Sequence, residues 1–192
     1  MIRDGDFEKK DAGVLKKYFN NFFRDFAQHP DFTWEVFEDL ISFEGWQKNR
    51  GENYGKLCAM YEQAKRPDLA LRARIKYGKM LAGEGRIPEA LKGLAGTCLL
   101  FPEEGAIIPG ILNEMETLCQ DADMGKTKAN YRSLASFYKA FLPKIPKKRG
   151  SSPSKYCMEM HEKGIKIFEM IGDTVAVSQC QAELQKLRSS KN

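Results

Sequence analysis

Five residues between positions 54 and 70 constrain this chain most, because they alternate bulky and small side chains at helical spacing. Tyr54, Leu57, Cys58 and Tyr61 stand at offsets of zero, three, four and seven residues, and Ala70 follows Cys58 after twelve. The first four share one stripe of a helix. A proline–aspartate break then separates them from Ala70, which lies early in a second helix. The pattern predicts two antiparallel helices that approach closely at their small residues.

The same offsets recur at Tyr131, Leu134, Ala135 and Tyr138. Helical hairpins beginning near 52, 87 and 127 give spacings of 35 and 40 residues, which is typical of stacked helical repeats. An overlapping, partial form of the pattern comprises Gly78, Leu81, Ala90, Leu94 and Pro102.

Over residues 51–187 the sequence resembles the tetratricopeptide repeat (TPR) family. The resemblance implies an all-α fold, a right-handed α-α superhelix of stacked antiparallel hairpins, and a protein-binding function. The middle hairpin keeps few signature residues and the loop after Leu142 is long, so related solenoids with looser hairpins stay open as alternatives.

Hydrophobic periodicity, prolines and glycines predict about nine helices and two regions. Residues 1–50 hold eleven of the 21 aromatic residues, and we expect an aromatic-rich helical hairpin packed on the repeat domain of residues 51–192. An aromatic surface used for docking or for self-association is the alternative. The expected helices cover residues 12–27, 34–49, 52–64, 67–82, 88–101, 107–120, 126–142, 154–171 and 174–188.

Composition favours an intracellular protein. The five cysteines are dispersed without a C-x-x-C pair, so we expect buried free thiols in a reducing, cytoplasmic compartment, with no bound metal. The polar N-terminus has no apolar core of a signal peptide, and no run of 18 apolar residues predicts a membrane span.

Motifs for catalysis or cofactors are weak, and we expect no enzyme and no cofactor. Gly125-Lys126-Thr127 lacks the upstream glycine and the strand of a phosphate-binding loop. His29 and His161 are far apart without ligand spacing, and a structural role is the simpler interpretation for both.

Charge is segregated along the chain. Residues 99–125 contain six acids and no base, whereas residues 124–158 contain nine bases and no acid, several of them in a basic loop over residues 143–153. The simplest explanation of this charge pattern is that the two runs lie on the solvated faces of neighbouring helices, which attract one another weakly. A basic edge for an acidic partner and a nucleic-acid site with stacking tyrosines are the alternatives.

We therefore predict a non-enzymatic adaptor or scaffold module that binds a protein or peptide, and an acidic partner is one option that the basic segment leaves open. A basic nucleic-acid adaptor using residues 126–155 is the alternative, and a regulatory domain of a larger protein is the third. Family resemblance places the binding residues on outward positions of the first helices, and the basic loop adds four more. The predicted partner-binding residues are Asn53, Lys56, Met60, Lys92, Lys128, Arg132, Lys144, Lys147, Lys148 and Arg149.

Overall fold

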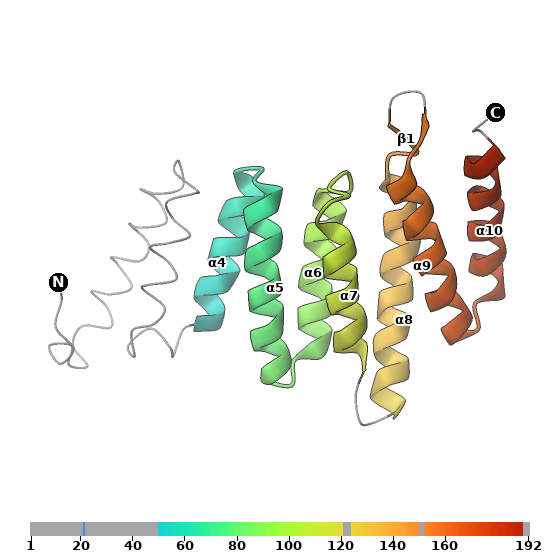
Figure 1. Cartoon of the computed structure of the whole chain (residues 1–192). Helices are drawn as coiled ribbons and strands as arrows, with labels where there is room; N and C mark the ends of the chain where they lie inside the picture. Colours follow the sequence, from blue (N-terminus) through green and yellow to red (C-terminus); the bar gives the residue numbers. More distant parts are fainter. Residues whose placement is uncertain (1–20, 22–49, 121–123, 150–151, 190–192) are drawn as a thin grey trace, which may run out of the picture. The chain divides into compact units, whose positions relative to one another are not determined.

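A computed structural model describes residues 21, 50–120, 124–149 and 152–189, and this part of the chain is all-α apart from two strands of two residues (Figure 1). Every helix predicted within it is present, with ends that agree to within two residues. The helices expected over 12–27 and 34–49, and with them the count of nine and the aromatic hairpin, lie outside the described residues. The observed helices are α4 (Arg50–Gln63), α5 (Pro67–Gly83), α6 (Ile87–Leu100), α7 (Ile108–Cys119), α8 (Met124–Phe141), α9 (Lys155–Ile171) and α10 (Thr174–Ser189).

The basic loop contains more regular structure than the sequence predicts, which is a correction. A 3-10 helix, η2 (Leu142–Lys144), follows α8, and β1 (Lys148–Arg149) pairs antiparallel with β2 (Ser152–Pro153). Strands of two residues are too short to show alternation, so periodicity gives no signal for them. The segment is anchored because Ile145 is buried and the Ser154 N–H donates to the Lys147 carbonyl at 2.9 Å.

The chain divides into two compact units, Met1–Tyr77 and Gly78–Asn192. In the first unit, the four residues of the opening motif are buried on α4, and Cys58 and Ala70 are fully buried. Glu62 and Arg74 form an ion pair of 2.7 Å between α4 and α5. The small residues therefore lie inside the helix contact, as the spacing predicts.

In the second unit, α6, α7 and α8 pack on one another, α9 packs on α8, and α10 packs on α9. The second copy of the motif is buried on α8, with Ala135 and Tyr138 at 1% and 0% exposure. Gly164 of α9 lies against α8 and η2, where an added Cβ would stand 3.1 Å from Leu142 Cδ1 and 3.3 Å from Tyr138 Cδ1. A small residue at 164 thus sets how closely α9 approaches.

Three of the interhelical turns close in the same way. A residue with positive φ, namely Lys65 (53°), Gly85 (76°) or Gly172 (76°), follows the helix end. In each turn, the N–H of the residue after the positive-φ position donates to a carbonyl in the last turn of the preceding helix. These bonds run from Arg66 to Tyr61 at 3.0 Å, from Arg86 to Leu81 at 2.8 Å, and from Asp173 to Phe168 at 2.9 Å. This closure satisfies carbonyls that the helix end leaves without intrahelical partners.

All five cysteines are free and buried, which confirms the prediction for the thiols. Burial raises the pKa of Cys58 and of Cys98 to about 12. None of the described helices combines the length and apolar character needed to cross a bilayer.

Candidate functional site

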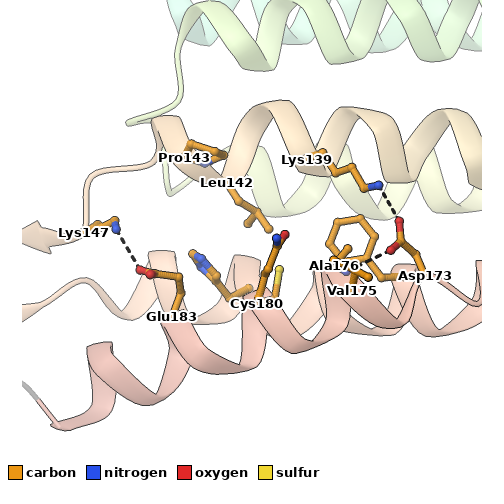
Figure 2. Close-up of a pocket in the computed structure, with 12 residues that line it drawn as sticks. Lys139, Leu142, Pro143, Lys147, Asp173, Val175, Ala176, Cys180 and Glu183 are labelled. Carbon is orange, nitrogen blue, oxygen red and sulfur yellow. Dashed lines mark hydrogen bonds and ion pairs between the residues drawn. The ribbon is translucent and has the colours of Figure 1, made fainter.

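The second unit carries a groove of about 610 Å³. Its walls are the end of α8 with η2 on one side and α10 on the other, and α9 contributes residues between them (Figure 2). Because α10 packs on α9, the space between α8 and α10 is open to solvent along this face.

Apolar side chains cover much of the groove. Phe168 of α9, Leu142 of η2 and Ala176 of α10 are buried in its floor, and Cys180 follows about one turn further along α10. Val175 stands at its mouth and is 66% exposed, which is high for a residue with a branched aliphatic side chain. The groove thus offers both a buried apolar floor and an exposed apolar contact point.

Two ion pairs connect the opposite walls. Lys139 of α8 contacts Asp173, the residue that precedes α10, and Lys147 contacts Glu183 of α10 at 3.0 Å (Figure 2). Asp173 also accepts the Ala176 N–H at 3.0 Å, so the same carboxylate caps α10.

Both carboxylates are held ionised. The hydrogen bond from Lys139 is the main cause that lowers the pKa of Asp173, with the Ala176 N–H second. Hydrogen bonds from Lys186 and then Lys147 lower the pKa of Glu183 to about 2. These acids are therefore engaged as lysine partners at neutral pH.

His161 is the one imidazole that lines the groove in the described part of the chain. Its Nδ1 lies 2.8 Å from the Cys157 carbonyl oxygen, and since a carbonyl only accepts, Nδ1 is the donor. The orientation of the ring is fixed by this bond within α9, and the side chain is buried at 4% exposure.

Chemically, the groove is suited to binding. Across the described residues, no group of three or more His, Cys, Asp and Glu side chains is placed to hold a metal ion. Apolar surface with a few polar or charged groups is the combination with which a groove selects and orients a ligand.

Two predicted binding residues are not on the surface, which contradicts the outward positions expected for them. Asn53 and Met60 are buried, at 6% and 8% exposure, and do not face outward. Positions 53, 57 and 60 share a face adjacent to the stripe of Tyr54 and Tyr61, because they follow the i, i+4, i+7 rule. Helix α4 is thus buried over a wider arc than the motif alone predicts.

The remaining predicted residues divide by location. Lys56 pairs with Glu52 at 2.9 Å along α4. Lys92 is exposed on α6, Lys128 and Arg132 on α8, and Lys144 on η2, whereas Lys147 reaches the groove. Lys148 and Arg149 belong to β1, but their side chains lie outside the described part.

Sequence reasoning missed most of the groove. Phe168, Val175, Asp173 and Glu183 carry no motif, and only their meeting in space distinguishes them from ordinary helical residues. The one available signal is Val175, an apolar residue at the second position of a helix, shortly after the glycine–aspartate turn.

No protein family, curated protein or solved structure matches this chain. The comparisons therefore assign no family, and the resemblance to tetratricopeptide repeats stays a prediction.

Proposed function

We propose that the chain is a non-enzymatic protein-binding module, an adaptor or scaffold built from TPR-like hairpins stacked into a right-handed superhelix. It works inside the cell, where five free thiols are kept reduced. Its ligand is a peptide segment of another protein, held in the groove between α8 and α10.

The groove is the observation that supports this proposal. It combines buried apolar floor residues with an exposed apolar side chain, Val175, at its mouth. Helical grooves of this kind recognise peptide segments through apolar anchors, while polar groups at the edge fix their orientation. The acidic side chains of the groove are paired with lysines, which leaves no unpaired carboxylate there for acid–base chemistry in the described part of the chain.

A nucleic-acid adaptor is the alternative, supported by the exposed Lys128 and Arg132. Tyr131 and Tyr138, the side chains that would stack on bases, are buried at 8% and 0% exposure. Phosphate contacts without stacking would give binding that weakens steeply with salt. The third proposal, a regulatory domain of a larger protein, uses the same groove.

The test compares two single substitutions that add the same charge to similarly exposed apolar residues. Val175 lines the groove, whereas Met170 of α9 is 60% exposed and does not line it. We expect crosslinking capture from native lysate to recover one set of proteins with the wild-type chain and with Met170→Glu, and to lose that set with Val175→Glu. Equal recovery by all three chains would remove the groove as the binding site.

A further inference from the structure

We propose that the peptide bound in the groove is acidic: an apolar anchor enters the groove, and flanking Asp or Glu residues lie along α8. This inference rests on the proposed function and adds the chemical class of the partner.

The first observation is the direction of charge along α8. Lys128, Arg132 and Lys139 are separated by four and seven residues, so they lie within about 40° of one face of the helix. Lys139 is a groove residue, and Arg132 and Lys128 stand about 10 Å and about 16 Å further along the same face. A peptide that leaves the groove along α8 therefore passes both.

The second observation is that two of these three cations lack an acidic partner among the described residues. Lys139 has Asp173, but Lys128 and Arg132 are exposed and form no ion pair within the part of the chain that the structure describes. Lys144, next to the groove residue Pro143, is exposed and equally without an acidic partner there. The sequence of α8 contributes no acidic side chain of its own.

The third observation is the balance inside the groove. Asp173 and Glu183 are each matched by a lysine from the opposite wall, and Lys186 gives Glu183 a second one. The acids of the groove are thus already neutralised and do not repel an acidic ligand. Among the described residues, Lys128 and Arg132 of α8 and Lys144 of η2 keep positive charge without an acidic partner, and this charge favours the association of acidic segments.

The occupant follows from these charges. A basic peptide would place its cations beside Lys128 and Arg132, which carry the same charge. Its only attraction would be to the acids of the groove, which are already paired with lysines. A neutral apolar peptide would fill the floor but leave the basic face of α8 unused. An acidic peptide with an apolar anchor satisfies both surfaces.

The experiment begins with selection from a random peptide display library, about 16 residues long so that an extended peptide spans the groove and the basic face of α8, on the full chain at low salt. We expect the selected peptides to be enriched in Asp and Glu beside one or two large apolar residues. Selected peptides without an acidic excess, or with a basic one, would overturn the inference.

The highest-affinity selected peptide is then labelled and measured by fluorescence anisotropy against five chains. We expect Val175→Glu to abolish binding and Met170→Glu to leave it unchanged. The double variant Lys128→Glu/Arg132→Glu should weaken binding about fivefold or more, because exposed pairs contribute little each and their reversal adds repulsion. Lys166→Glu reverses one exposed cation of α9 that does not line the groove; it is the control for charge reversal elsewhere on the surface and should have little effect. Circular dichroism melting of each variant checks that the fold is kept.

The outcomes separate the two proposals. Loss of binding in Val175→Glu with no change in Lys128→Glu/Arg132→Glu would keep the groove as a peptide site and refute the acidic partner. Unchanged binding in Val175→Glu, or the absence of any selected peptide, would refute both. Tighter binding of a single-stranded oligonucleotide than of the selected peptide, lost on charge reversal of α8, would identify a nucleic acid and also refute the inference.

Discussion

The three turns with positive φ allow a reciprocal test, because two of them use glycine and one uses lysine. A non-glycine residue in the left-handed region costs about 1–2 kcal/mol through contact between its Cβ and the backbone. Gly172 has no atom within 4 Å of where a Cβ would stand, so substitution by alanine tests the backbone alone. Alanine also reduces the entropy of the unfolded chain, which offsets about 0.4–1 kcal/mol of the cost.

The expected net effects have opposite signs. Gly172→Ala should destabilise the α9–α10 turn by about 1 kcal/mol, and Lys65→Gly should stabilise the α4–α5 turn by a similar amount. Lys65→Ala keeps the left-handed strain while removing the charged side chain, and should change stability little. Gly83 is helical, two residues before Gly85, so Gly83→Ala should stabilise whereas Gly85→Ala destabilises.

Hydrogen exchange followed by mass spectrometry is the appropriate assay, because it reports each segment separately, whereas a single melting curve averages over the two compact units. A change of about 1 kcal/mol alters the opening equilibrium about fivefold, which segment-resolved exchange rates detect. Faster exchange in α4 and α5 after Lys65→Gly would refute the reasoning, since it would show that lysine is not strained at this turn.

Three further predictions concern side chains in the second unit. The hydroxyl of Tyr138 is buried without a hydrogen-bond partner, so Tyr138→Phe should raise the free energy of unfolding, measured by urea denaturation, by about 1 kcal/mol. Tyr131→Phe removes a hydrogen bond to Gln120 and should lower the free energy of unfolding by a similar amount. The pKa of Glu183 is depressed to about 2, so its ion pairs stabilise the fold above the unfolded-state pKa of about 4.3 and are lost as the pH falls towards 2; a carboxyl titration midpoint near 4 in NMR would contradict this. Burial should make Cys98 inert to a thiol reagent at about pH 8 in the native chain, and Cys180, which lines the groove, should react before it; mass mapping of the modified thiols gives the order.

Local signals predict the helices well because each is encoded within a dozen or so residues. Proline at 67 or 88 starts a helix and glycine at 172 ends one, and these effects depend on backbone geometry rather than on distant contacts. Where the sequence-based predictions are wrong, the cause is tertiary. Asn53 is polar and Met60 is flexible, so each is acceptable at a surface position. Only the packing around α4 buries them.

The turn at Lys65 shows a different limit. Sequence reasoning finds left-handed residues through glycine, and Lys65 takes this conformation without one. The helix end and the proline at 67 fix the turn from both sides, so the strain is accepted at the position between them.

By itself, the sequence determined the α-helical class, the helix ends and the burial of small residues such as Cys58 and Ala135, because helical periodicity records which face avoids water. Only the tertiary structure decided that Lys139, Phe168 and Val175, from three different helices, share one groove. The angle at which α10 packs on α9 determines whether the space beside α8 is open, and that angle depends on the side chains of several helices at once. No local pattern along the chain encodes it.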